Sequence, residues 1–600
     1  MKETMTMHTL PRWDIDPIYP GIKSDEFLSD LARMGELAYR LDMLLDDEAS
    51  RKVDLTKWLS DVLTVYQDML DHLETLNAYA SAVLTTDTAD VDAMNGLNKV
   101  EAAALQVQAA GVKLLNVLAA EQEGVERLLL ENEDFKPYSY VVGELFKAQK
   151  HQMSPAEEAL AADLNRSGAD AWSRLQEAVS SSASTIWDES TGERKTVIQL
   201  RAMATDADRA VREKAYRKEL AIWKEHEVDM AYSLCGVKGA TITLDKRRGW
   251  DDPLDHAVSQ ARIDRTVLDA LIHTLERNLP MFRKYLKAKA KLLGVGRCAF
   301  YDLFAPVGTS TKRWTFEESR KFIIRQFSAF SPAMGAFAKS AFDRNWIDAE
   351  PRPGKVGGAY DTAFPLRKQS RILSNFDYSF SGVSTLAHEL GHAYHDSVVL
   401  DYPSLLRTYP MTLAETASIF SEFIVFQGAL ADSDDAGKVT LIEHFLQDAC
   451  QVCVDILCRF YFENAVFARR QEGDIMADEF CSMMLGCQKR TYGDGLDSEA
   501  LHPYMWAVKG HYYSSDLSFY NFPYAFGQLF GLGLFARSKE DASFPESYVK
   551  LLRKTGSDSA VNVAATAGCD ITGEAFWQEG MDIISSYCGQ FCDLADGQGR

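Results

Sequence analysis

The first third of the chain repeats one pattern that strongly limits its fold. Apolar residues recur at spacings of three and four over residues 69–84, 93–133 and 154–184, and these stretches contain few Gly or Pro. This spacing places apolar side chains on one face of an α-helix. The stretch 93–133 is long enough for two antiparallel helices or for one very long helix. We therefore expect a mainly α-helical fold.

Turn-forming residues interrupt the helical pattern at two places. Gly192 marks a turn, and the short apolar run Val197–Leu200 after it is predicted as a small strand. Residues 346–364 hold two Pro and three Gly within eight residues, which predicts a loop. Ile372 and Leu373, which follow this loop, suit a second short strand.

Length and charge exclude several classes of protein. A chain of 600 residues is too long for one ordinary hydrophobic core, so we expect two lobes that share a cleft, or two domains. A net charge of −23 argues against nucleic acid or an anionic membrane as a partner. The N-terminus has no apolar segment behind a basic start, and the apolar segment 524–536 is too short to span a bilayer. We therefore expect a cytoplasmic protein.

Three of the ten cysteines lie close together, at Cys450, Cys453 and Cys458. A C-x-x-C pair is a candidate for redox chemistry or zinc binding. Here no second pair follows, and the neighbouring residues are apolar and helical in pattern. We favour a buried helix face, because free Cys is among the most buried residue types.

The stretch TLAHELGHAYHD, residues 385–396, contains a pattern typical of zinc sites. His388, Glu389 and His392 form H-E-x-x-H. On a helix the two histidines lie on one face about one turn apart, so both imidazoles can reach one Zn²⁺. Glu389 points in a different direction and can contact the water that the metal activates. The spacing thus serves two ligands and a general base.

The alternative is an ordinary buried helix with no metal. A chance H-E-x-x-H has an expectation of only about 0.02 in a chain of this composition. Gly391 inside the helix costs about 1 kcal/mol relative to Ala. Small residues at Gly391 and Ala393 predict that another backbone approaches this helix closely.

A catalytic zinc needs a third protein ligand. The continuation H-x-x-G-x-x-H is excluded, because its Gly and His positions hold His395 and Val398. A following helix offers Glu415 and Glu422, which are seven residues apart and share one face. We favour Glu415 as the ligand and Glu422 as its supporting partner.

Two other interpretations stay open at this point. Glu415 follows Thr412 by three residues, which is the spacing of a capping box in the first turn of a helix. Asp396 is a rival ligand one turn beyond His392, although ligands at i, i+4 and i+8 would move along the helix away from one metal. We interpret His395 as a neighbouring polar contact.

Residues 509–527 contain His511, Tyr520 and Tyr524, and their Gly and Pro predict a loop. Such a loop ordinarily packs its aromatic rings on the core. Beside a metal site, a His and a Tyr hydroxyl can instead donate hydrogen bonds to the oxyanion that develops when a carbonyl is attacked.

Four motifs together identify a family. They are RILSNFD at 371–377, TLAHELGHAYH at 385–395, LAETASIFSE at 413–422 and SFYNFPYAFG at 518–527. Through them, nearly the whole chain resembles the oligoendopeptidase F family, relatives of thimet oligopeptidase among the thermolysin-like zinc peptidases.

The resemblance implies a zincin-like fold with two helical lobes around a deep central cavity that admits short peptides. A small β element lies beside the H-E-x-x-H helix. Residues 1–190 would form an N-terminal helical lobe, and residues 191–600 a catalytic zinc-peptidase domain, parts of which contribute to both lobes. The chain would hold one Zn²⁺.

The resemblance also assigns roles to residues. It implies that His388, His392 and Glu415 bind zinc and that Glu389 is the base. His511 and one tyrosine, Tyr520 or preferably Tyr524, would stabilise the tetrahedral intermediate. The peptide backbone would bind, by strand addition, to an edge strand and its neighbours, at Gly357, Gly358, Ala359, Tyr360, Ser374 and Asn375.

These expectations describe an endopeptidase that hydrolyses internal bonds of short oligopeptides. One alternative is a zinc exopeptidase of the dipeptidyl carboxypeptidase type, which needs a cation for the substrate carboxylate; Arg367, Lys368 and Arg371 are candidates. Another is a metal-free helical protein that binds peptides without cleaving them. The sequence does not predict the oligomeric state.

Overall fold

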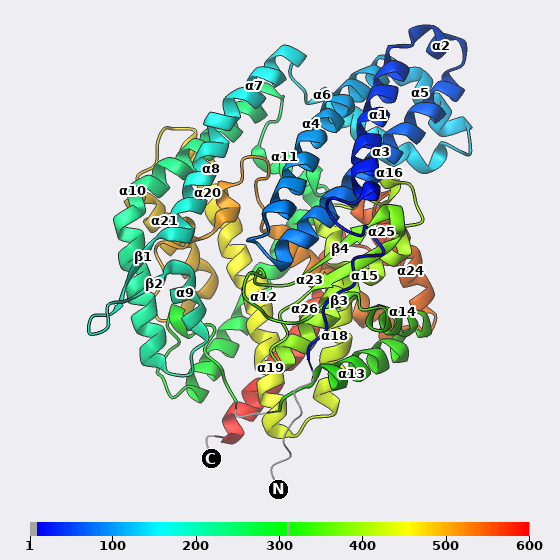
Figure 1. Cartoon of the computed structure of the whole chain (residues 1–600). Coiled ribbons are helices and arrows are strands. Elements are labelled where there is room, and N and C mark those ends of the chain that lie inside the picture. Colours follow the sequence, from blue (N-terminus) through cyan, green and yellow to red (C-terminus); the bar gives the residue numbers. More distant parts are fainter. Residues whose placement is uncertain (1–8, 309–311, 599–600) are drawn as a thin grey trace. The chain divides into compact units, whose positions relative to one another are not determined.

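The computed structural model describes residues 9–308 and 312–598. Helices dominate the described residues, as expected from the sequence (Figure 1). The chain forms two compact units, each assembled from three stretches. The first unit comprises the described residues of Met1–Lys150, Lys312–Gly428 and Arg537–Cys569, and the second those of His151–Thr311, Ala429–Ala536 and Asp570–Arg600. The division at residue 190 and the central cavity stay predictions.

The first unit contains the N-terminal helices, a small sheet and the helix of the H-E-x-x-H motif. Its helices are α1 (Asp25–Asp46), α2 (Glu48–Val53), α3 (Leu55–Thr86), α4 (Val91–Ala120), α5 (Gln122–Glu131), α6 (Ser139–Lys150), α13 (Phe316–Phe330), α14 (Pro332–Asp343), α15 (Phe380–Val399), α16 (Ser404–Arg407), α17 (Met411–Ala414), most of α18 (Thr416–Ala431), α24 (Phe544–Lys554) and α25 (Ala560–Ala565).

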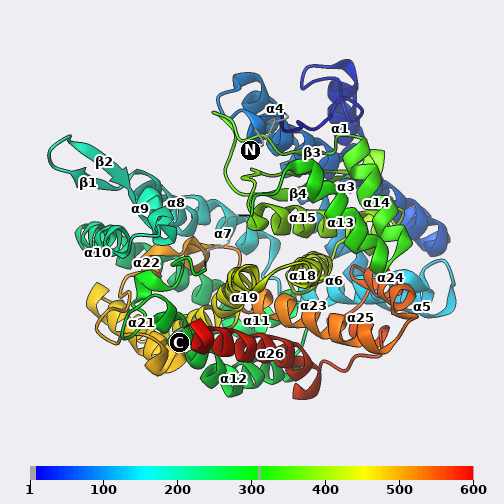
Figure 2. The same ribbon diagram turned by 90° about the horizontal axis from the view of Figure 1, so that it is seen from below.

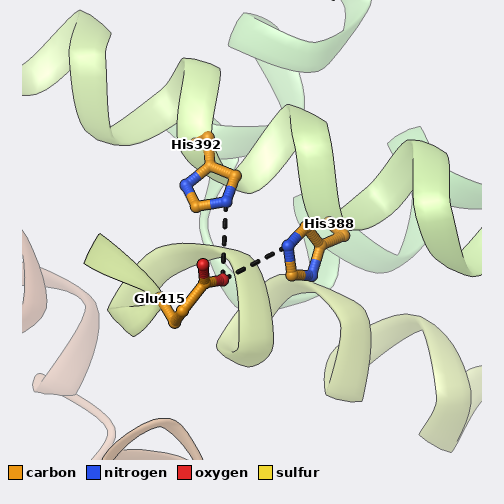
Figure 3. Close-up of side chains that lie close together, drawn as sticks. All are labelled: His388, His392 and Glu415. Carbon is orange, nitrogen blue, oxygen red and sulfur yellow. Dashed lines mark ion pairs between the residues drawn. The ribbon is translucent and has the colours of Figure 1, made fainter. Parts of the chain in front are cut away.

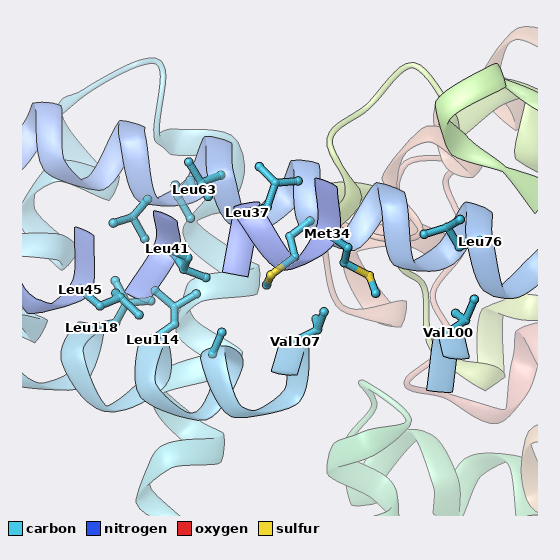
Figure 4. Close-up of a cluster of buried hydrophobic side chains, with 14 of the residues drawn as sticks. Met34, Leu37, Leu41, Leu45, Leu63, Leu76, Val100, Val107, Leu114 and Leu118 are labelled. Atoms are coloured by element: carbon cyan, nitrogen blue, oxygen red, sulfur yellow. The ribbon is translucent and has the colours of Figure 1, made fainter. Parts of the chain in front are cut away.

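The helical pattern of the first third builds a core between α1, α3 and α4. The residues just before these helices cap them: the side chains of Ser24, Asp54 and Asp90 accept hydrogen bonds from free backbone N–H groups of the first turn. The stretch 93–133 forms two helices, because α4 ends at Ala120 and α5 begins at Gln122. Figure 4 shows side chains of this core, which include Met34, Leu37, Leu41, Leu45, Leu63, Leu76, Val100, Val107, Leu114 and Leu118.

Helix α4 has a second property that the sequence analysis did not single out. It is the one helix, among the residues that the structure describes, that is long and apolar enough to cross a membrane. One such helix is weak evidence of a membrane span, since core helices of soluble proteins pass the same test of length and composition. Here α4 packs against α1 and α3.

A three-stranded sheet lies against α15. The strands are β3 (Ile347–Asp348), β4 (Tyr360–Phe364) and β5 (Gln369–Leu373), in the order β3-β5-β4. β3 is parallel to β5 and β4 is antiparallel to it. Helix α15 contacts β4 and β5, and Figure 2 shows α15 beside the sheet.

The sheet confirms one expectation and corrects two. The strand at Ile372 and Leu373 is confirmed as part of β5. The predicted loop 346–364 is wrong at both ends, because β3 and β4 occupy them. The strand that leads to Ser374 and Asn375 is not an edge strand, because β3 pairs with its second side; β4 is the edge strand beside the motif helix.

The motif helix α15 packs closely on α18, as the small residues predict. A Cβ added at Gly391 would lie 2.5 Å from the carbonyl oxygen of Ala417 and 2.7 Å from Cα of Ser418. Cβ atoms essentially never come this close to other atoms, so only Gly permits this approach of the two backbones.

The second unit holds the remaining helices and a β-hairpin. Helices α12 and α26 lie side by side in it (Figure 2). Its helices are α7 (Pro155–Ser167), α8 (Ala169–Ser182), α9 (Val197–Ala202), α10 (Arg209–Arg247), α11 (Pro253–Gln260), α12 (Arg265–Leu292), α19 (Asp435–Cys450), α20 (Ile456–Arg470), α21 (Ala477–Tyr492), α22 (Met505–Val508), most of α23 (Phe522–Glu540) and α26 (Glu574–Gln598).

The hairpin corrects the strand predicted at Val197–Leu200. The strands are β1 (Ser184–Asp188) and β2 (Glu193–Thr196), joined by a turn in which Gly192 has φ of +72°. The apolar run after them is helix α9 instead. Thr196 and Gln199 form a capping box that starts this helix, and a four-residue run with three apolar residues does not distinguish helix from strand.

The three clustered cysteines are buried, as predicted. Cys450 ends α19, Cys453 lies in a π-helical turn at Gln451–Asp455, and Cys458 belongs to α20. Burial raises the pKa of all three thiols, so they remain protonated.

Candidate metal centre

Three potential metal ligands converge in the first unit. His388 and His392 extend from α15, and Glu415 lies at the junction between α17 and α18. Glu415 Oε2 is 3.3 Å from His388 Nε2 and 3.5 Å from His392 Nε2 (Figure 3). Among residues 9–308 and 312–598, this is the only group of three or more His, Cys, Asp or Glu whose ligand atoms all lie within 4.8 Å of one another.

The separations fit a tetrahedral zinc ion. Ligand atoms about 2.0–2.1 Å from a tetrahedral Zn²⁺ lie about 3.3 Å from one another. The two imidazole–carboxylate separations have this size. Two imidazole nitrogens and one carboxylate oxygen are also the protein ligands of several catalytic zinc sites, which keep a position open. The residues present therefore suit such a metal.

A break between two helices positions Glu415. Helix α17 begins after Pro410 with no side-chain cap, and Thr412 lies inside it, so the alternative interpretation of a capping box is wrong. Glu415 follows the last residue of α17, with φ −82° and ψ 5°, and α18 begins at the next residue. Ser418 Oγ donates a hydrogen bond of 2.7 Å to Glu415 Oε2. The first turn of α18 thus orients the Glu415 carboxylate.

Glu422 supports His388 from the opposite side. Its Oε2 is 3.2 Å from His388 Nδ1, and Ser384 Oγ donates a 2.9 Å hydrogen bond to its Oε1. A carboxylate on one ring nitrogen fixes the tautomer, so that the other nitrogen can bind a metal. The predicted proximity of Glu422 to the cluster is therefore present in the structure.

The charges in the cluster shift each other's pKa. Burial alone would lower the pKa of His388, but its hydrogen bonds with Glu415 and Glu422 outweigh burial and raise that pKa well above its ordinary value. Burial would raise the pKa of Glu415, but His388 and His392 outweigh burial and hold that pKa far below its ordinary value. The metal-free cluster is therefore an ion-paired network.

Glu389 lies beside the ligands in the wall of a cavity of about 460 Å³. Only 6% of Glu389 is exposed, and burial raises the pKa of its carboxyl above the ordinary value, against the opposing effect of His388 and His392. A carboxylate with a raised pKa beside such a cavity is suited to accept a proton.

The cavity brings in side chains that the sequence analysis missed. Glu74 from α3, Asp361 from β4 and Tyr409 line it together with the cluster. No local pattern identifies these three, because they are far apart in the sequence. Ser384 and Ser418 were also missed, although Ser384 precedes His388 by one helical turn and Ser418 follows Glu415 by three residues, which are detectable spacings.

Asp396 and His395 lie outside the ligand cluster. Asp396 lines the cavity and accepts a 3.1 Å hydrogen bond from Ser370 Oγ. His395 Nε2 is 2.8 Å from Thr555 Oγ1, and its ring stacks on Tyr409 at 4.3 Å between centroids. Burial lowers the pKa of His395 to about 3, so the ring is neutral.

The residues predicted to bind peptide backbone surround β4. Ala359 and Tyr360 line the cavity, and the Tyr360 hydroxyl is 2.5 Å from Thr85 Oγ1. Asn375 Nδ2 donates 3.0 Å hydrogen bonds to the carbonyl oxygens of Val356 and Gly358, which fixes the turn before β4. The remaining two differ in exposure: Gly357 is exposed and Ser374 is buried.

His511, Tyr520 and Tyr524 form an aromatic group in the second unit. Their ring centroids lie 4.8 Å apart for His511 and Tyr520, and 6.0 Å apart for His511 and Tyr524. The predicted loop is wrong at its end, because α23 begins at Phe522. Burial, with Arg459 and Lys509 nearby, lowers the pKa of His511 to about 4. The metal ligands belong to the other unit, so these three roles stay predictions.

Known proteins resemble this chain over most of its length. The model of peptidase family M3 matches residues 202–583, and the model described as oligopeptidase F matches residues 117–183. Oligopeptidase PepF of Bacillus subtilis is 24% identical over 465 residues, which cover 76% of this chain and 69% of that protein. Group B oligopeptidase PepB of Streptococcus agalactiae is 25% identical over 475 residues, which cover 76% of each.

Solved structures share the fold. Oligoendopeptidase-F from Enterococcus faecium aligns with a TM-score of 0.69 at 18% identity, over 95% of this chain and 99% of that chain. PZ peptidase A aligns with a TM-score of 0.71 at 16% identity, over 98% and 99%. Because one family model matches more than half of the residues, this chain belongs to peptidase family M3.

Proposed function

We propose that this chain is a zinc-dependent endopeptidase that hydrolyses internal peptide bonds of short oligopeptides. One observation carries the proposal: Glu415 Oε2 lies 3.3 and 3.5 Å from His388 Nε2 and His392 Nε2, beside the buried Glu389. Membership of peptidase family M3 and relatives named oligoendopeptidase F support the reaction and the size of the substrate.

The proposed mechanism assigns a task to each side chain of the cluster. His388, His392 and Glu415 would hold one zinc ion, with Glu422 orienting His388. Bound zinc polarises a substrate carbonyl and increases the acidity of water. Glu389 accepts the proton of the attacking water and passes it to the nitrogen of the leaving amine.

The substrate would bind along β4. The free edge of this strand, which begins at Tyr360, and the preceding residues Gly357, Gly358 and Ala359 offer backbone groups for strand addition. Asn375 keeps the preceding turn in shape through its two hydrogen bonds. By resemblance, His511 and Tyr524, or Tyr520 in its place, would donate hydrogen bonds to the developing oxyanion.

The exopeptidase alternative lacks support from its three candidate cations. Arg371 is buried and donates to the carbonyl oxygens of Asp14 and Ser370 and to Gln369. Arg367 donates to the carbonyl oxygen of Ile18, and its guanidinium lies over a tyrosine ring. Lys368 pairs with Asp401 at the surface. None of them lines the cavity that holds the cluster. The intact cluster disfavours the metal-free binding protein.

A quenched fluorescent peptide of about ten residues tests the proposal. Zinc-loaded protein is incubated with it, with and without a chelator, and the products are identified by mass. We expect internal cleavage that stops with the chelator and returns with added zinc. Release of terminal dipeptides alone would favour the exopeptidase, and binding without cleavage by zinc-loaded protein would favour the binding protein. A cytoplasmic location belongs to the same proposal and is tested by cell fractionation.

A further inference from the structure

Two carboxyl groups form a hydrogen-bonded pair in the wall of the cavity. Asp361 lies in the middle of the edge strand β4, and Asp396 lies one turn beyond His392 on α15. Their side chains hydrogen-bond to each other, and Asp396 also accepts from Ser370 Oγ at 3.1 Å. Asp361 Oδ1 is buried and has no hydrogen-bond partner. The proposed mechanism uses neither residue.

The pair has no cationic partner. Within the part of the chain that the structure describes, no Lys, Arg or His nitrogen lies within ion-pair distance of either carboxyl. Arg407 is committed elsewhere, because its NH2 group bonds Asp71 at 2.7 Å and Glu74 at 2.8 Å.

The pair offers two carboxyl groups to a cation in the cavity. A hydrogen bond between two carboxyls needs one proton, and a cation placed against the pair favours the ionised form of the other carboxyl. Burial is the first cause that raises the pKa of both carboxyls. A buried charge without a partner is unfavourable unless a ligand supplies the opposite charge.

The sheet geometry directs substrate side chains to this pair. β4 has a strand partner on one side only, namely β5. In a strand added to the free side, the residue opposite Asp361 projects its side chain to the same face as Asp361. That face borders the cavity shared with His388, Glu389, His392 and Glu415.

Resting on the proposed peptidase function, we infer that Asp361 and Asp396 form an acidic subsite for a substrate cation. This subsite binds an ammonium or guanidinium group of the substrate, within two residues of the bond that is cleaved. A Lys or Arg side chain, or the free amino terminus of a short peptide, carries this group. The subsite determines specificity, and Asp361 is its central residue.

A set of matched peptides tests this subsite in the wild-type protein. The peptides differ only at one position, which holds Lys or the uncharged, similarly long norleucine, and the position is moved along the sequence. Each is made with a free and with an acetylated N-terminus. We expect kcat/KM to be at least about tenfold higher for Lys than for norleucine at one position near the cleaved bond. Loss of the preference only on acetylation would assign the subsite to the amino terminus.

Two variants and a control connect the preference to the pair. In Asp361→Asn and in Asp396→Asn, the ratio of kcat/KM between the Lys and norleucine peptides should fall to about one. Asp401→Asn removes an exposed carboxylate of the same unit and should keep the wild-type ratio. If either variant fails to fold, the ratio of kcat/KM between the Lys and norleucine peptides in the wild-type protein still tests whether the subsite exists.

The outcomes separate this inference from the proposed function. Cleavage of Lys and norleucine peptides at equal kcat/KM, with either N-terminus, would overturn the acidic subsite and leave the peptidase. The same peptides are also titrated by fluorescence anisotropy onto the zinc-loaded protein. Lys-selective binding without any cleavage would support the subsite and overturn the peptidase.

Discussion

His388 is held between two glutamates, one on each ring nitrogen. Its Nε2 lies 3.3 Å from Glu415 Oε2 and its Nδ1 lies 3.2 Å from Glu422 Oε2. Glu415, at the junction before α18, and Glu422, within α18, thus reach opposite sides of one imidazole. This geometry separates their proposed roles, because only Glu415 also faces His392.

Replacing Glu415 should remove the metal. In Glu415→Ala, two imidazoles remain, and we expect less than stoichiometric zinc after dialysis, measured by elemental analysis of folded protein. Circular dichroism confirms folding. Retention of one zinc per chain would contradict the assignment and make Asp396 or Glu422 the ligand to test.

Replacing Glu422 should weaken zinc binding without abolishing it. In Glu422→Gln the charge that orients His388 is lost, and the zinc affinity should fall by about 10–100-fold, measured by competition with a chromophoric chelator. Asp401→Asn is the control, since it lies at the surface and pairs with Lys368. An unchanged affinity would show that the carboxylate of Glu422 is not needed to orient the ring of His388.

Replacing Glu389 should stop turnover while leaving the binding of zinc and of peptide intact. In Glu389→Ala the proton acceptor is missing, and kcat should fall by at least about 10²–10⁴-fold. Zinc content and peptide affinity, measured on the same preparation, should stay close to wild type. Full activity in this variant would remove Glu389 from the role of base.

Zinc binding should release protons, and its affinity should rise with pH. In the metal-free protein the pKa of His388 lies well above its ordinary value, so its ring carries a proton at neutral pH that zinc must displace. Calorimetry in buffers of different ionisation enthalpy measures the released protons. The affinity for zinc should increase with pH until His388 is neutral in the metal-free protein. A pH-independent affinity between about pH 6 and 8 would contradict this.

A methyl group at Gly391 should destabilise the first unit. In Gly391→Ala the new Cβ meets the backbone of α18 at 2.5 Å, and we expect a loss of about 1–3 kcal/mol in the free energy of unfolding. Gly143→Ala is the matched control: it lies in helix α6 with no atom within 4 Å of its added Cβ, and should stabilise by about 0.5–1 kcal/mol. Urea denaturation measures both. Equal stability of the two variants would mean that α18 moves aside without cost.

The sequence predicted what depends on local spacing. The helices of the first third and the face shared by His388 and His392 follow from periodicity, and Glu415 is favoured by its place on the following segment, in agreement with the resemblance. The errors occur where local patterns are ambiguous. Val197–Leu200, where three of four residues are apolar, suits a strand or a helix. The alternative capping box at Thr412 is absent because the helix already begins at Met411. Glu74, Asp361 and Tyr409 meet only through tertiary packing, which no spacing reveals.

The contact at Gly391 has a consequence for metal exchange. The backbones of α15 and α18 touch there. This packing, the ion pairs and the Ser418 hydrogen bond hold His388 and His392 of α15 at fixed separations from Glu415. The coordination sphere is preorganised before an ion enters. An apoprotein prepared by chelation should accordingly stay native and reload within a single binding step, so that the supply of metal, rather than refolding, sets how fast a population of these molecules is switched on.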